Sequence, residues 1–234
     1  MAYEGVDFLI AIGHALSVSS ASISRPDRRH LRRAETIEEV VDVAMQVMAE
    51  QGVAGLSLGE VARRIGIRPP SLYVYFASKN AIYDAVFARG WRDITQTMET
   101  LPEPDETTDL RGYLLEFAEL FVRWSVQHPV YTQLMGWRPV PGYEPSEEAY
   151  EPAVVSYERG RSLLAQLQAL GLFDAECTVD ELMRAWTILA SGVITQQLAN
   201  APKEPFEKGS FTTMLPQLVE MYCAHYAPRQ RNAP

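Results

Sequence analysis

Apolar residues recur at helical spacing along most of the chain, and the strict alternation typical of strands is nearly absent. The first such stretch predicts a helix from about Arg32 to Gln51, with its apolar side formed by Ile37, Val40, Val41, Ala44, Val47 and Met48. Gly52 follows in the position favoured for a left-handed helix end. The pattern as a whole predicts an all-α protein.

Capping residues divide the next stretch into short helices. Ser57 and the glutamate three residues later match a capping box, in which the serine caps the helix and the glutamate reaches back. Gly66 ends this helix, and the pair Pro69-Pro70 opens a third one. Ser78 can cap a fourth, longer helix. Two short helices joined by a turn, between two longer ones, predict a helix-turn-helix.

A connector rich in proline and acidic residues, 101–109, marks the best candidate boundary in the chain. The apolar pattern after it predicts an apolar helix that stops near Pro129, a short helical piece through Leu134, and a loop over 136–145. It then predicts long helices over about 146–170 and 178–199. Pro216 lies inside the last apolar stretch, which predicts a kink or a helix start near Leu215.

Three segments are expected from these boundaries. Residues 1–28 are predicted to be a poorly ordered N-terminal extension, residues 29–92 a helix-turn-helix domain, and residues 93–234 a C-terminal helical domain.

The net charge of −9 is unevenly distributed. Residues 25–92 carry eleven Lys and Arg against eight Asp and Glu, whereas residues 93–234 carry ten against twenty. The first part is therefore mildly basic and the second strongly acidic. This asymmetry indicates that only the N-terminal module is suited to nucleic acid.

Little in the sequence indicates catalysis or a metal. Cys177 and Cys223 lie far apart, as expected for reduced thiols in a cytoplasmic protein, and the four histidines lack metal-ligand spacing. "GLSLG", residues 55–59, has the G-x-S-x-G pattern, but no strand precedes Ser57, which already has a capping role. No apolar run approaches the roughly 20 residues that span a bilayer. We expect neither an enzyme nor a membrane protein, and no cofactor.

The aromatic segment "IRPPSLYVYFASKN", residues 67–80, is the most distinctive part of the sequence. On a helical wheel Leu72 and Phe76 face the core. The opposite side and its flanks hold Pro70, Ser71, Val74, Tyr73 and Tyr75. A helix with such an exposed ridge fits the major groove of a DNA duplex.

The stretch "LSLGEVARRIGIRPPSLYVYFASKNAIYDAVF" resembles the N-terminal DNA-binding domain of the TetR family of transcriptional regulators, over roughly residues 34–90. The run from Leu72 to Lys79 is its most specific part. The resemblance implies base and phosphate contacts from Ser57, Arg68, Pro69, Pro70, Ser71, Tyr73, Val74, Tyr75 and Lys79. Leu58 and Gly59 depart from the polar residues of some members, which puts contacts from these two positions in doubt.

Four arginines precede or open the first predicted helix: Arg28, Arg29, Arg32 and Arg33. They form either a basic arm that lies along the DNA or a solvated charged cluster.

The resemblance also implies that the acidic half dimerises and holds a small effector. Its last two helices would pair with those of a second copy through Leu182, Ala185, Leu189, Val193, Gln196, Leu215, Leu218, Val219 and Tyr222. The alternative is that these side chains pack only within the monomer. An apolar cavity for a hydrophobic or amphipathic effector is expected among Phe117, Phe121, Trp124, His128, Tyr131, Met135, Trp137, Tyr157 and Trp186.

These observations together predict a ligand-responsive regulator that binds palindromic double-stranded operator DNA as a homodimer. Repression relieved by the effector is the default mode for such a regulator. The alternative is a helical adaptor that binds protein partners through the same short helix and has no role on DNA.

Overall fold

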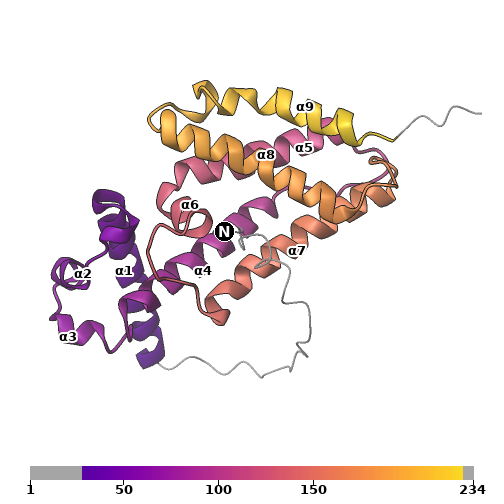
Figure 1. Ribbon diagram of the computed structural model, residues 1–234. Coiled ribbons are helices and arrows are strands. Elements are labelled where there is room, and N and C mark those ends of the chain that lie inside the picture. The colour runs from indigo at the N-terminus through magenta and orange to yellow at the C-terminus, as the bar shows by residue number, and fades with distance from the viewer. Residues whose placement is uncertain (1–27, 229–234) are drawn as a thin grey trace, which may run out of the picture.

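The computed structural model describes residues 28–228, which form helices without a strand (Figure 1). The helices are α1 (Arg28–Gln51), α2 (Leu58–Ile65), α3 (Pro69–Leu72), α4 (Lys79–Met98), α5 (Leu110–Gln127), α6 (Pro129–Gly136), α7 (Glu147–Ala169), α8 (Val179–Asn200) and α9 (Leu215–Tyr226). The prediction of an all-α fold is confirmed. The extension expected at 1–28 lies, apart from Arg28, outside the described residues.

Most helix starts follow the capping signals in the sequence. The hydroxyls of Ser57, Ser78, Ser146 and Thr178 each accept a hydrogen bond from the backbone N–H three residues later, and so does the carboxylate of Asp109. These bonds satisfy N–H groups that the first turn of a helix cannot pair internally. Local sequence therefore fixes where α2, α4, α5, α7 and α8 begin.

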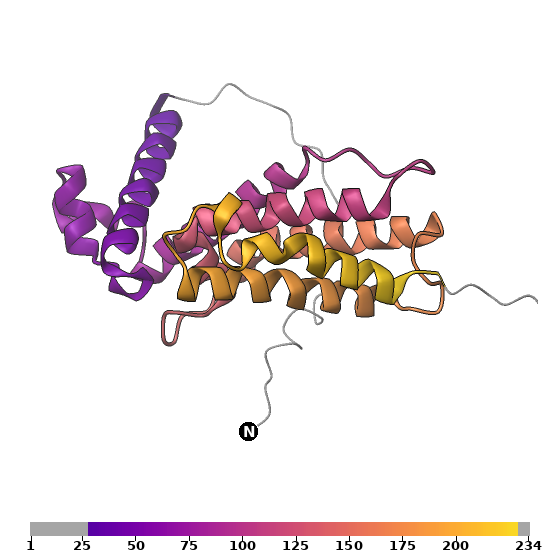
Figure 2. The same ribbon diagram turned by 90° about the horizontal axis from the view of Figure 1, so that it is seen from above.

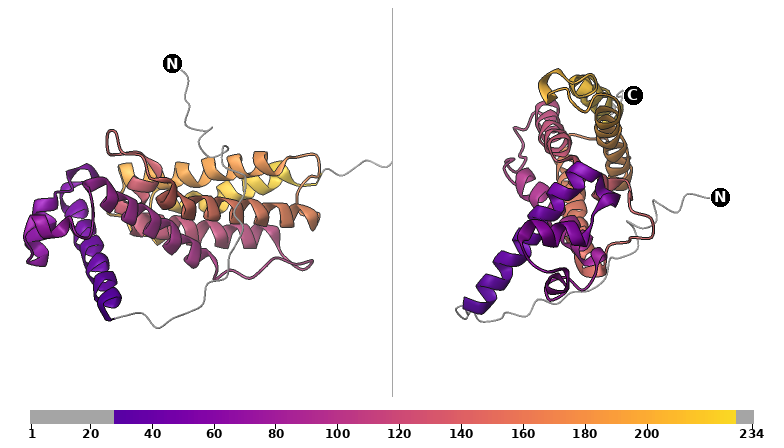
Figure 3. Two further views of the ribbon diagram at one scale, coloured as in Figure 1. Left: turned by 90° about the horizontal axis from the view of Figure 1, so that it is seen from below. Right: turned by 90° about the vertical axis from the view of Figure 1, so that its left-hand side faces the viewer.

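Helices α1 to α3 and the first half of α4 surround a small core at one end of an elongated helical body (Figures 2 and 3). Val40, Val47, Val61 and Ile82 are fully buried there. Each deeply buried side chain of this size contributes roughly 1.5–3 kcal/mol relative to an exposed one.

Helix α4 leaves this end and runs into the body, where it packs against α5, α6 and α7 (Figure 1). The boundary expected between residues 92 and 93 falls inside this continuous helix. The N-terminal core also includes Trp124 of α5, Tyr131 and Leu134 of α6, and Tyr143 of the following loop. The division into two domains stays a prediction, because no break in α4 marks it.

A second core holds the remaining helices together. It joins α5, α7, α8 and α9 through Ala118, Leu167, Leu182 and Val219, among other buried residues. Helices α8 and α9 lie side by side along the outer side of the body (Figures 1 and 2).

Three local expectations are corrected. Helix α3 has only one turn, and residues 73–75 continue it as turns, in which the N–H groups of Val74 and Tyr75 bond the oxygens three residues back instead of four. The carboxylate of Glu60 binds Arg63 and Arg64 rather than reaching back to Ser57. The four arginines expected ahead of the first helix belong to α1 itself.

Two glycines at the ends of α2 should respond oppositely to alanine. Gly66 has φ 79°, in the left-handed region, so Gly66→Ala should destabilise the protein by about 1–2 kcal/mol. Gly59 lies within the helix, where a Cβ would meet Ser57 Oγ at an ordinary 3.8 Å, so Gly59→Ala should stabilise it by about 0.5–1 kcal/mol. Urea unfolding at one fixed protein concentration measures both changes. Equal shifts of the same sign would contradict this account.

Candidate functional site

The short helix α3 presents an exposed ridge at the end of the molecule. Tyr73 and Val74 are 55% and 65% exposed. Arg68, Pro69, Pro70 and Ser71 are exposed as well. Leu72 and Phe76 are buried beneath them, 1% and 7% exposed. The side predicted to face outward therefore does so, although the helix is shorter than expected.

Helix α1 holds this ridge in place through a residue whose role the sequence did not indicate. The guanidinium of Arg33 donates a hydrogen bond to the backbone oxygen of Val74 at 3.1 Å, and it lies over the ring of Tyr75 at 5.5 Å. Tyr75 is half-buried, so it offers less surface than Tyr73. Arg33 is thus a positioning contact rather than part of a free basic arm.

The start of α4 is tied to the turn before α2. Lys79 donates from Nζ to the carbonyl oxygen of Ala54 at 3.1 Å and lies over the ring of Tyr83. The buried Tyr83 hydroxyl donates to the oxygen of Val53 at 2.8 Å, and burial raises its pKa to about 12. One of the three donors of Lys79 is thus engaged within the protein, which leaves two for an outside partner.

Two arginines of the basic module are neutralised locally. Arg63 and Arg64 both donate to the carboxylate of Glu60, and Arg64 also pairs with Glu50 at 2.6 Å. The hydrogen bonds from the two guanidinium groups lower the pKa of Glu60 to about 2. The positive charge beside the ridge therefore comes from Arg33, Arg68 and Lys79.

Polar contacts join the N-terminal end to the body. From α4, Arg89 donates to the Tyr131 hydroxyl of α6 at 2.6 Å and pairs with Asp42 of α1 at 2.7 Å. Asp84 accepts hydrogen bonds from the Tyr143 hydroxyl at 2.9 Å and from the backbone N–H of Ser146. Burial, and then the bond to Asp84, raise the pKa of Tyr143 far above its usual range. Helix α4 is therefore held by polar contacts to α1, to α6 and to the loop before α7, at the junction where the N-terminal end meets the body.

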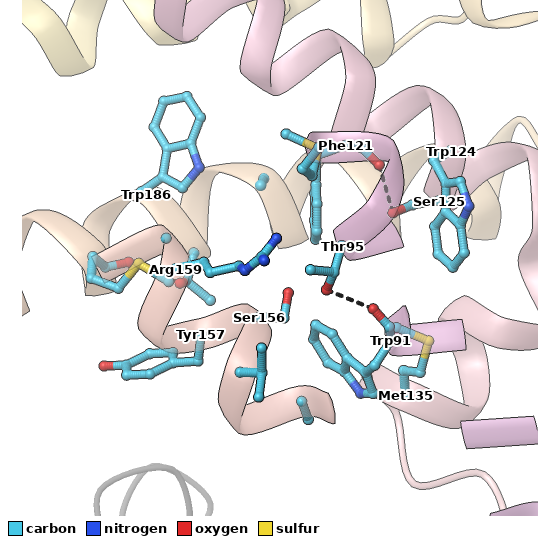
Figure 4. Close-up of a pocket in the computed structure, with 18 of the residues that line it drawn as sticks. Trp91, Thr95, Phe121, Trp124, Ser125, Met135, Ser156, Tyr157, Arg159 and Trp186 are labelled. Carbon is cyan, nitrogen blue, oxygen red and sulfur yellow. Dashed lines mark hydrogen bonds between the residues drawn. The ribbon is translucent and has the colours of Figure 1, made fainter. Parts of the chain in front are cut away.

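The body contains an open cavity of about 1260 Å³ between α4, α5, α6, α7 and α8 (Figure 4). Its wall includes all four tryptophans of the chain, Trp91, Trp124, Trp137 and Trp186. Seven of the nine residues expected around an effector line it: Phe117, Phe121, Trp124, Met135, Trp137, Tyr157 and Trp186.

His128 and Tyr131, the other two expected residues, do not line the cavity. Nδ1 of His128 lies 2.8 Å from the oxygen of Trp124, and its ring packs against that indole. Tyr131 instead points its hydroxyl to Arg89 at the junction. The rings of His128 and Tyr131 thus contact neighbouring residues of the protein instead of the cavity.

Several cavity residues were not identified from the sequence. Trp91, Thr95 and Met98 lie on α4, and Ser156 and Arg159 lie on α7. A polar residue at the inner edge of a helix looks like any surface residue until the neighbouring helices are placed.

Five residues expected at a dimer interface lie in the core of the monomer. Leu182, Val193, Leu215, Val219 and Tyr222 are at most 5% exposed within the monomer, so they have almost no surface to offer a second copy. Ala185, Leu189 and Leu218 are partly buried, and Gln196 is exposed. The large apolar side chains that are exposed on α8 and α9 are Ile188 and Met221, at 73% and 67%.

Within residues 28–228 no cluster of three or more His, Cys, Asp or Glu side chains could hold a metal ion. None of the helices in that range is long and apolar enough to cross a membrane.

Comparisons with known proteins find that the N-terminal part is similar to the DNA-binding part of bacterial transcriptional regulators. Residues 40–86 match the family model described as bacterial regulatory proteins of the tetR family. The chain is 24% identical over 119 residues to the HTH-type transcriptional regulator Rv1816 of Mycobacterium tuberculosis, and the match spans 51% of each chain. The sequence similarity thus covers about half the length of such relatives.

Solved structures extend the likeness to the whole fold. The TetR family regulator PfmR of Thermus thermophilus matches with a TM-score of 0.60 at 18% identity, covering 82% of this chain and 99% of PfmR. The regulator FadR of Bacillus subtilis, solved with stearoyl-CoA, matches with a TM-score of 0.63 at 14% identity, covering 80% of this chain and 97% of FadR. At these identities the matches show a common fold.

The bond between Tyr143 and Asp84 should stabilise the junction measurably. Tyr143→Phe removes a hydrogen bond to a charged acceptor and should cost about 1.5–3 kcal/mol. The control is Tyr73→Phe, which removes the hydroxyl of an exposed ring and should leave the free energy of unfolding unchanged. Urea unfolding followed by circular dichroism compares the two variants, and equal stability would show that the bond contributes nothing.

Proposed function

Because the chain is a TetR family transcriptional regulator with a helix-turn-helix DNA-binding domain, we propose that it binds operator DNA as a homodimer and represses transcription until a hydrophobic or amphipathic effector releases it. The observation that carries this proposal is the exposed ridge on α3, whose side chains project from the end of the molecule while Leu72 and Phe76 anchor it from below.

On DNA the ridge would enter the major groove. Ser71 would bond a base edge or a phosphate, and Val74 would contact a thymine methyl group. Tyr73, Arg68 and Lys79 would bind phosphates on either side and so set the position of the ridge. Ser57, Pro69, Pro70 and Tyr75 complete the proposed contact set.

A dimer suits the outer side of α8 and α9. The exposed side chains of Ile188 and Met221 project there, and Ser191 and Gly192 are small enough for a second copy to approach closely. Leu189, Leu218, Ala185 and Gln196 keep surface on these two helices. A twofold dimer would place two α3 ridges in successive major grooves of a palindromic site, about 34–36 Å apart.

The effector would act through α4. This helix supplies Trp91, Thr95 and Met98 to the cavity wall, and it begins directly beside the ridge. A ligand that favours one position of α4 over another lowers the affinity for DNA by its differential binding to the two states. The stearoyl-CoA bound by FadR, an amphipathic molecule, supports an effector of this general kind here.

Tyr73→Ala should weaken specific DNA binding roughly 10- to 100-fold and leave the fold intact, because the ring is exposed. Fluorescence anisotropy on the promoter DNA that flanks the gene, with scrambled DNA beside it, measures the loss. Circular dichroism and gel filtration serve as controls for folding and assembly. An identical shallow isotherm on both DNAs for the unaltered protein would favour a protein-binding adaptor instead.

Charge on the proposed dimer face should separate the two copies without unfolding them. Ile188→Asp and Met221→Asp alter exposed positions, so each monomer should keep its helical content while sedimentation velocity shows the mass of one chain. Asn80→Asp, at an exposed polar position in the first turn of α4, is the control for added charge. A dimer that persists in both aspartate variants would place the interface elsewhere.

A further inference from the structure

The cavity wall is mostly apolar, and four of its eight serine and threonine hydroxyls donate to the backbone. Thr95, Ser125 and Thr187 each bond the carbonyl oxygen four residues earlier in their own helix, and Thr132 bonds the oxygen of Ser125. Their protons are used, so towards a ligand these groups are chiefly weak acceptors. They do not by themselves favour any charged ligand.

Arg159 differs from the rest of the wall. It lies on α7, and Figure 4 shows its guanidinium directed into the space between the aromatic rings. It forms an ion pair with Glu99, the residue that follows α4. The other lining residues with a charged side chain are Arg138, which pairs with Glu144, and the exposed Glu103 and Glu158.

The pair between Arg159 and Glu99 leaves donors available. A guanidinium has five N–H groups, and only Nη1 is engaged with the carboxylate. Both side chains are about half exposed, and ion pairs of this kind contribute little to stability. A ligand can therefore take the remaining donors, or replace Glu99, at small cost.

A second donor stands one helical turn away. Ser156 is three residues before Arg159, so the two lie on the same side of α7. Its hydroxyl forms no hydrogen bond among the described residues, and Figure 4 shows it directed into the cavity. Together the two side chains offer a forked cation and a neutral donor, a combination that fits the two oxygens of a carboxylate.

We infer that the cavity selects amphipathic organic anions, with a carboxylate bound by Arg159 and Ser156 and an apolar body packed among the tryptophan and phenylalanine rings. This rests on the proposed function, because it names the chemical class of the effector. A neutral amphiphile would leave the guanidinium without a new partner, and a cationic one would be repelled by it. The cavity, larger than the roughly 300–1,000 Å³ of most ligand pockets, leaves room for a long apolar chain.

The tryptophans make the test direct. All four line the cavity, so their fluorescence should change when a ligand enters. The protein is titrated with dodecanoate, dodecanol and dodecylamine below the concentrations at which these form micelles. Dodecanoate should bind roughly 10- to 100-fold more tightly than the other two, as expected for a charge-assisted hydrogen bond. Equal binding of the alcohol and the carboxylate, or no binding of dodecanoate, would overturn the inference.

Three variants separate ligand binding from helix pairing. Arg159→Gln should remove the preference for the carboxylate, whereas Arg161→Gln, on the same helix and paired with Asp180 outside the cavity, should keep it. Glu99→Gln breaks the same ion pair but leaves Arg159 in place, so it should keep or strengthen the preference. Equal loss in Glu99→Gln and Arg159→Gln would mean that the pair is structural, and the inference would be wrong.

The effect on DNA is measured separately by anisotropy. Dodecanoate that binds through Arg159 without changing DNA affinity would support the ligand class and contradict effector release. DNA that dissociates with dodecanol as readily as with dodecanoate would support effector release and contradict the selection of anions.

Discussion

One continuous helix constrains the whole molecule. Residues near the start of α4, such as Ile82 and Tyr83, are buried in the N-terminal core, while Trp91 and Thr95, further along, line the cavity. An α-helix of this length behaves as a nearly rigid rod, so its two ends cannot move independently. In the proposed mechanism, a ligand that displaces the cavity half of α4 also acts on the start of this helix, which lies beside the ridge.

Contacts between α4 and α6 connect the cavity wall to the N-terminal end. A Cβ on Gly90 would come within 2.6 Å of the sulfur of Met135 and within 2.8 Å of the Tyr131 ring, so the absence of a side chain lets α6 lie against α4. Met135 faces the cavity, whereas Tyr131 holds Arg89 at the junction. Helix α6 therefore lines the cavity with Met135, and through Tyr131 it also takes part in the polar contacts that hold the N-terminal end. In the proposed mechanism, this arrangement lets a ligand and DNA bias the same equilibrium.

The ridge on α3 and the cavity in the body differ from an ordinary protein core in different ways. The ridge on α3 needs exposed side chains, so a one-turn helix relies on buried anchors such as Phe76 and on Arg33 for its position. The cavity needs unfilled volume, which its aromatic walls and the surrounding helices keep open. Both the ridge and the cavity wall are less closely packed at the surface proposed to meet DNA or a ligand. Side chains directly behind each surface hold it in position by packing or polar contacts.

Local sequence determined the helices and the ridge. Capping residues such as Ser57 and Ser78 act within a few positions, and the pattern around Leu72 specified which side of α3 is buried. Only the tertiary structure decided how each apolar stripe is used. The stripe that includes Leu182 was expected to meet a second copy and packs inside the monomer instead, and Arg159 looked like an ordinary surface residue until α4 and α7 enclosed a cavity beside it. Helical spacing shows that a side chain shares an apolar side, but which neighbour covers that side depends on contacts between residues far apart in the chain.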